Sequence, residues 1–259
     1  MINHNSNLIE AVPVFNNAGS GSIYGNSGLL INLYADDFTG TGTWPNRTGL
    51  GDISTSGGTF VDSGSLGWGF SGGATLLLSA SVALPLLSTT GFTCMFAATM
   101  GTSDNTKQTP LLQSLTGTYL PAQGYTGHAT FYNPTGSVNN TLSQNGTQPG
   151  GTYNPSLPNF PTLANLSNPL STLYYYSITY YPSSNTVFVT EDDKGFATFS
   201  PYTGNSFWFN LGSTKFGGNG GISNFGTFAG SLQRMVFYNH PLTGAQIINN
   251  LLPALKRGA

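Results

Sequence analysis

Short apolar stretches alternate with turns rich in Gly, Pro, Asn and Ser along most of the sequence. Within these stretches apolar and polar residues tend to alternate, which is typical of strands with one buried face. The clearest case is a hairpin of residues 173–181 and 186–190, joined by the turn Pro182-Ser-Ser-Asn185. Strands are predicted over residues 28–35, 60–61, 68–70, 74–82, 89–100, 109–114, 127–132, 173–181, 186–190, 196–199, 207–211 and 232–238, with a further strand and loop over 215–221.

The segment 226–252 combines a strand with the only clear helical pattern. Leu232, Met235 and Phe237 are apolar with polar residues interleaved, which predicts a half-buried strand with one irregularity in its alternation. Thr243 is the expected N-cap of a short helix. Pro253 is expected to end that helix, whose apolar residues recur at helical spacing: Ile247, Ile248, Leu251 and Leu252.

Many short strands and one helical segment predict an all-β fold, a sandwich of two antiparallel sheets. Sandwiches of 259 residues occur as one domain, so a single domain is expected over residues 29–259. Residues 1–28 are polar and rich in Gly and Asn, and we interpret them as an extended arm or partner-binding segment. Residues 133–170 have few apolar anchors and are predicted to form a long inserted loop.

Three segments carry a resemblance to a known family. Gly226–Leu252 resembles the closing strand and helix of concanavalin A-like, laminin G-like jelly rolls, written G-x-I-D-x-V-R-I-Y-N-R-A-L-S-x-x-E-I. The strand 89–100 is similar to the family's D-F-T-I-x-x-W-V strand, with Phe96 near its Trp. The hairpin 173–190 resembles W-H-H-V-A-V-T-Y-D-x-x-x-x-x-L-Y-V-D-G-x. These matches fall within residues near 29–252 and follow the order of the family. They imply a two-sheet jelly-roll sandwich with one short C-terminal helix. They imply a binding or structural role without chemistry of its own.

The charge content is low: 6% of residues are charged, against roughly 25% in ordinary globular proteins. With a net charge of −2, repulsion between copies is weak, which favours a protein that lives in a large assembly or on a cell surface. The alternative is an acid-tolerant secreted protein. Nucleic-acid binding is not expected because the basic residues are scattered: Arg47, Lys107, Lys194, Lys215, Arg234, Lys256 and Arg257.

Compartment signals are few. Cys94 is the single cysteine and stands in an apolar run, so it is expected to be a buried core thiol. The first residues have neither a basic region nor an apolar run, so no classical secretion leader is expected. No stretch reaches the roughly 18 apolar residues of a membrane-spanning helix, and no membrane insertion is expected. These features fit a virion protein released by lysis, with an extracellular or cell-surface location as the alternative.

No catalytic residue is predicted. Glycoside hydrolases of this fold place carboxylates as E-x-D-x-E on one strand, and none of the nine acidic residues is so arranged. Glu191 and Asp193 are two apart but belong to a hairpin tip. The protein is therefore expected not to be an enzyme, and a degenerate glycosidase remains only if carboxylates converge from distant loops.

No cofactor is expected, because the three histidines lack zinc spacing and the Gly-rich runs lack a phosphate-loop signature. Calcium is the remaining metal candidate, since some laminin G-like members bind it through loop carboxylates. The two acidic clusters that could hold it are Asp36–Asp37 and Glu191–Asp193.

Aromatic side chains are the remaining candidate ligand contacts, because sugars stack on π-surfaces. Trp44 stands in a polar loop before Pro45 and is the best candidate for an exposed aromatic ring.

The leading functional hypothesis is a non-enzymatic virion structural protein of a tailed phage: a capsid decoration, fibre or adhesin subunit that could contact host-surface glycans. The arm 1–28 would dock it onto other virion proteins or onto copies of itself. The alternative is a carbohydrate-binding module or bacterial surface adhesin of the same fold. Fold alone does not decide between them.

Overall fold

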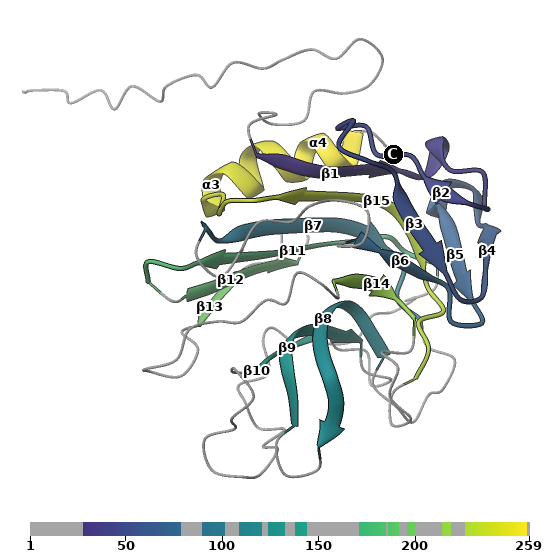
Figure 1. The fold of residues 1–259 in the computed structure, drawn as a ribbon. Helices are drawn as coiled ribbons and strands as arrows, with labels where there is room; N and C mark the ends of the chain where they lie inside the picture. Colours follow the sequence, from purple (N-terminus) through teal and green to yellow (C-terminus); the bar gives the residue numbers. More distant parts are fainter. Residues whose placement is uncertain are drawn as a thin grey trace, which may run out of the picture.

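The computed structural model describes residues 28–78, 90–101, 109–120, 124–132, 138–143, 171–184, 186–191, 196–199, 214–218 and 226–257. These residues form an all-β sandwich of two antiparallel sheets with a short helical segment at the C-terminal end (Figure 1). The predicted fold class is confirmed. No described helix has the length and apolar character that a bilayer crossing requires.

The first sheet, sheet A, contains the closing strand and the predicted hairpin. Its described strands follow the order β13 (Phe196–Phe199), β12 (Thr186–Glu191), β11 (Tyr174–Tyr181), β7 (Phe92–Ala98), β15 (Ser231–Tyr238), β5 (Trp68–Ser71) and β4 (Thr59–Asp62). β1 (Leu29–Tyr34) pairs with the C-terminal half of β15, whereas β5 pairs with its start. Strands β1 and β5 therefore share one side of β15.

The second sheet, sheet B, is built from shorter strands and one long pair. Its described order is β10 (Val138–Ser143), β9 (Gly124–Tyr132), β8 (Thr109–Leu120), β14 (Lys215–Gly217), β6 (Thr75–Leu77), β3 (Ile53–Ser56) and β2 (Thr43–Trp44). Sequence analysis did not identify β2 and β3, because the turn-rich segment around them contains few apolar residues.

The main core lies between the two sheets and is rich in aromatic rings. Phe96 of sheet A meets Phe216 of sheet B edge to face, with ring centroids 5.2 Å apart. Cys94 belongs to this core with no exposed surface and is a free thiol, as expected from the sequence. A second apolar cluster lies on the outer face of sheet A, where Met95 and Val236 pack against the C-terminal helical segment.

The irregular alternation in the closing strand is a β-bulge. Leu232 and Arg234 pair with adjacent residues of β7, so Gln233 is an extra residue in β15. The bulge changes the phase of the strand. Leu232 therefore faces the core between the sheets, whereas Arg234, Val236 and Tyr238 lie on the outer face, toward the helical segment.

The C-terminal helical segment begins as predicted and ends later than predicted. Thr243 caps it with a capping box: its Oγ1 accepts from the Gln246 backbone N–H, and Gln246 Oε1 accepts from the Thr243 N–H at 2.7 Å. The helix does not stop at Pro253. It runs through α3 (Gly244–Gln246), the π-helical turn η4 (Ile247–Leu251) and α4 (Leu252–Arg257). The wider π turn just before Pro253 accommodates a residue that has no N–H and crowds the preceding turn.

The predicted loop 133–170 and the predicted arm 1–28 lie mostly outside the described residues. Within the predicted loop 133–170 the structure places strand β10, which pairs along six residues with β9, so that part of the prediction was wrong. An edge strand takes its hydrogen bonds from one neighbour and needs little apolar alternation of its own. The rest of this loop, apart from 138–143, and residues 1–27 of the arm lie outside the described residues.

Candidate functional site

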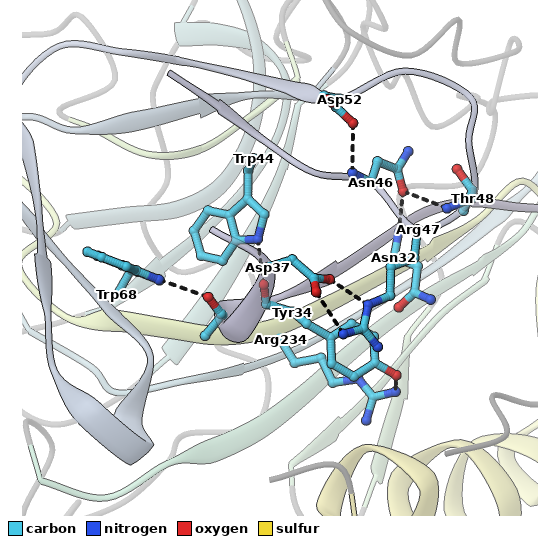
Figure 2. A network of polar contacts seen from close by, with 11 residues as sticks. Asn32, Tyr34, Asp37, Trp44, Asn46, Arg47, Thr48, Asp52, Trp68 and Arg234 are labelled. Carbon is cyan, nitrogen blue, oxygen red and sulfur yellow. Dashed lines mark hydrogen bonds and ion pairs between the residues drawn. The ribbon is translucent and has the colours of Figure 1, made fainter. Parts of the chain in front are cut away.

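The outer edge of β1 is covered by the segment that contains Trp44 and Thr48 (Figure 2). Asn46 contributes most of the cover: its Oδ1 accepts from the Asn32 N–H at 2.9 Å, and its Nδ2 donates to the Leu30 carbonyl at 3.0 Å. The Arg47 backbone N–H donates to the Asn32 carbonyl at 3.1 Å. A strand edge carries unpaired donors and acceptors, and here side chains replace the missing neighbouring strand.

Trp44, predicted to be an exposed ring for sugar stacking, is fully buried, so that prediction was wrong. The ring stacks on Phe38 with centroids 4.5 Å apart, and its Nε1 donates to the Tyr34 carbonyl at 2.8 Å. Strand β2 returns the loop to the core, which a count of polar neighbours does not reveal. Because no face of Trp44 is open, it cannot stack against a sugar.

Tyr34, the last residue of β1, is in contact with two guanidinium groups. The Arg47 Cζ lies 3.5 Å from the ring centroid and the Arg234 Cζ lies 3.9 Å from it. Two guanidinium groups this close to one ring cannot share a face, so they lie on opposite faces (Figure 2). Cation–π contacts of this kind hold the guanidinium groups in fixed orientations.

Asp37 and Arg47 form an ion pair in fork geometry at the surface end of this stack. Arg47 Nε lies 2.5 Å from Asp37 Oδ2, and Nη2 lies 2.8 Å from Oδ1. Asp37 belongs to the short helical turn η1 (Ala35–Asp37) that follows β1 directly. The Arg47 side chain is 28% exposed and that of Asp37 is 25% exposed. Both groups therefore reach solvent while their orientation is fixed.

The calcium candidates Asp36 and Asp37 do not assemble a metal site in the described structure. Asp37 forms an ion pair with Arg47, and Asp36 is exposed on the same turn. Nowhere among the described residues do three His, Cys, Asp or Glu side chains gather as metal ligands would. Of the second cluster only Glu191 is described, at the end of β12, and Asp192 and Asp193 lie outside the described residues.

Arg234 is the buried member of the network, with 1% of its surface exposed. Its Nη1 donates to the carbonyls of Ala254 and Leu255 in α4, and its Nη2 donates to the Tyr34 hydroxyl. Burial lowers the pKa of Arg234 to about 10, an effect that the nearby Tyr238 partly opposes. The C-terminal end of a helix carries partial negative charge, so Arg234 ties α4 to the sheet through a favourable charge–dipole contact.

Chemically, the network offers a fixed, partly exposed carboxylate and guanidinium and a buried frame that holds them. Its described carboxylates, Asp37 and Asp52, accept hydrogen bonds from Arg47 and from the Asn46 N–H. Sequence reasoning missed Asn46, Arg47 and Arg234. Neither a motif nor a hydrophobic period marks them, and the Arg234–Tyr34 contact joins residues 200 positions apart.

Comparison with known proteins gives fold neighbours only. No family model matches the sequence, and no curated protein matches it. Among solved structures, a Trypanosoma rangeli sialidase in complex with sialic acid matches with a TM-score of 0.58 and 14% identity, over 95% of this chain and 36% of that chain. A structure reported with the finding that cell entry of botulinum neurotoxin type C depends on two ganglioside molecules matches with a TM-score of 0.53 and 12% identity, over 88% of this chain and 51% of that one.

These neighbours correct one expectation from the sequence. A protein that is not an enzyme was expected, yet several of the matching structures are sialidases, at 14 to 15% identity. The absence of an E-x-D-x-E strand was therefore too narrow a criterion, because it tested one carboxylate arrangement only. This chain spans about a third of each sialidase chain, and at this identity the likeness concerns the fold.

Proposed function

We propose that this protein is a glycan-binding β-sandwich domain and that the Asp37–Arg47 pair contacts the ligand. Support comes first from the pair itself: a carboxylate and a guanidinium, each about a quarter exposed, are held in fixed geometry at the end of β1. Sugars present adjacent hydroxyl groups, each of which can both donate and accept a hydrogen bond. A carboxylate has lone pairs beyond those used by one arginine, so Asp37 can accept from a hydroxyl while paired.

Preorganisation supports the same assignment. The Arg47 guanidinium is packed on the Tyr34 ring, and its backbone N–H is bonded to the Asn32 carbonyl. Side chains already fixed before binding lose less conformational entropy when a ligand arrives. A small polar ligand with few apolar contacts benefits most from such a site.

The fold neighbours support the ligand class. One of them is a sialidase complex with sialic acid, and another concerns a toxin whose cell entry depends on gangliosides. We extend the carbohydrate class from those proteins to this chain. We also propose that the chain belongs with the concanavalin A-like and laminin G-like sandwiches, because three segments of its sequence resemble motifs of that family.

Titration of sialylated and neutral oligosaccharides against the full chain, followed by calorimetry, tests the proposal. Asp37→Asn keeps the shape of the side chain but removes the charge, so we expect affinity to fall at least tenfold. Asp36→Asn is the matched control, because Asp36 lies on the same turn and is exposed. Equal affinity of the Asp37→Asn and Asp36→Asn proteins would contradict a binding role of the pair.

A setting within a phage particle, as decoration, fibre or adhesin subunit, rests on the low charge content and the polar arm of the sequence. We propose it as the location in which a glycan-binding domain of this composition would serve attachment. Density-gradient fractionation of a lysed source culture checks it. Co-sedimentation with particles at a fixed ratio to the shell protein is the expected result, and recovery in the soluble or cell-wall fraction would contradict it.

A further inference from the structure

Strand β4 is the end strand of sheet A in the described structure, and, unlike the edge of β1, its outer edge is covered by none of the described residues. In the β4–β5 hairpin the Ser63 N–H donates to the Gly67 carbonyl at 2.9 Å, and Phe70 of β5 donates on its other side to Gly230 at 2.8 Å. Hydrogen-bonded and non-hydrogen-bonded pairs alternate along an antiparallel ladder. Phe60 and Asp62 therefore direct their backbone N–H and C=O groups away from β5, and the described residues supply no hydrogen bond to them.

The surface at this edge is open. Val61 is 55% exposed, and Thr59 and Asp62 are exposed as well. Figure 1 shows β4 as the outermost strand on its side of the sandwich. An acidic residue usually protects an edge strand by repelling a partner. Here the Asp62 carboxylate turns back and accepts from the Gly64 N–H at 2.8 Å, so it leaves the edge accessible.

We propose that β4 pairs antiparallel with β4 of a second copy of this chain, about a two-fold axis at Val61. In an antiparallel pairing about a two-fold axis, residues at equal distances from the axis lie opposite each other on the two copies. The axis must therefore place residues with outward-facing backbone groups opposite one another. With the axis at Val61, Phe60 of each copy exchanges two backbone hydrogen bonds with Asp62 of the other. Val61 then faces Val61 of the second copy as a non-hydrogen-bonded pair, the closer of the two pair types.

A second copy fits this edge for reasons visible in the chain. The axis at Val61 satisfies the outward-facing groups of Phe60 and Asp62 on both copies and covers the exposed valine with an apolar side chain. The net charge of −2 leaves little repulsion between copies. The two copies of sheet A become one continuous sheet, a mode of assembly in which main-chain hydrogen bonds supply the affinity.

Cysteine crosslinking tests this register directly. Cys94 is fully buried, so among the described residues the accessible thiol is the one that Val61→Cys introduces. Opposed residues in a non-hydrogen-bonded pair have Cα atoms about 4.5 Å apart, within the range of a disulfide. We expect Val61→Cys to form a disulfide-linked dimer at least tenfold faster than Leu50→Cys. Leu50 is the matched control because it is 54% exposed but lies outside β4.

Sedimentation of the full chain gives the second readout. Wild type is expected to dimerise with rising concentration, and Val61→Lys is expected to sediment as a monomer because it places two like charges face to face. At concentrations where wild type is monomeric, both variants should unfold at the wild-type temperature, since the side chain is at the surface. A monomeric wild type, a Val61→Lys protein that still dimerises, or equal crosslinking of Val61→Cys and Leu50→Cys would overturn the proposal.

Discussion

Asn46 occupies the position of a neighbouring strand beside Asn32. Its carboxamide accepts from the Asn32 N–H at 2.9 Å and donates to the carbonyl of Leu30, two residues earlier on β1. One side chain therefore completes both halves of a ladder step while being only 5% exposed itself. Its Nδ2 also donates to the Gly51 carbonyl, and this bond closes the loop that holds Arg47. The same side chain thus stabilises the sheet edge and positions the candidate ligand contact.

Asn46→Ala should destabilise the fold by about 1–3 kcal/mol, because it leaves the buried Asn32 N–H without a partner and removes the Nδ2 donor from the Leu30 and Gly51 carbonyls. Urea unfolding followed by circular dichroism measures the change. Thr48→Ala is the control: Thr48 Oγ1 shares the Leu30 carbonyl with Asn46, so its loss leaves no group unpaired there. A loss for Asn46→Ala no larger than for Thr48→Ala would show that water replaces Asn46 at the edge.

Arg234→Met should cost about 2–4 kcal/mol and should loosen the C-terminal helix. The substitution removes the donors to the Ala254 and Leu255 carbonyls and to the Tyr34 hydroxyl. Arg234→Lys should recover less than half of the loss, because an ammonium group cannot reproduce the fork of the guanidinium. Hydrogen exchange of residues 244–257 separates this role from general destabilisation. We expect the exchange rate of the variant, relative to wild type, to increase more in residues 244–257 than in β7 and β11.

Cys94 should be unreactive in the native protein. It is fully buried, and burial raises the pKa of its thiol, so the reactive thiolate is scarce. A thiol reagent at pH 8 should label less than a few per cent of the native chain, and the whole sample once the protein is unfolded in guanidinium. Rapid labelling without denaturant would show that the core between the sheets opens under native conditions.

The sequence predicted most strands, because alternation reports which face of a strand is buried. It predicted the hairpin of β11 and β12, the Thr243 cap and the burial of Cys94. It failed where tertiary contacts overrule the local pattern. Trp44 has polar neighbours in the chain, yet β2 directs it into the core, where it stacks on Phe38.

The candidate site was hardly predictable for the same reason. Arg234 and Tyr34 meet through the pairing of β1 with β15, which joins opposite ends of the described chain. The irregular alternation at Gln233 was the one local signal, and it marked the bulge that turns Arg234 toward the helix. A pattern can thus indicate that a strand changes phase without revealing which side chains come together.

His240 should make the protein less stable in mild acid. Partial burial lowers its pKa below the ordinary value of 6.5, because desolvation disfavours the charged ring. The ring packs edge-on against Tyr238 with centroids 5.7 Å apart, and its Nδ1 lies 3.3 Å from Asn239 Oδ1. Between the lowered pKa and 6.5 the unfolded chain binds more protons than the folded chain. The stabilising contribution is therefore complete above about pH 6.5 and is lost as the pH falls through the lowered pKa.

Thermal unfolding at pH 8 and pH 5 measures the effect. His240→Gln should show a smaller decrease in Tm between these two pH values than wild type, and an equal decrease in both proteins would assign the acid sensitivity to the carboxylates.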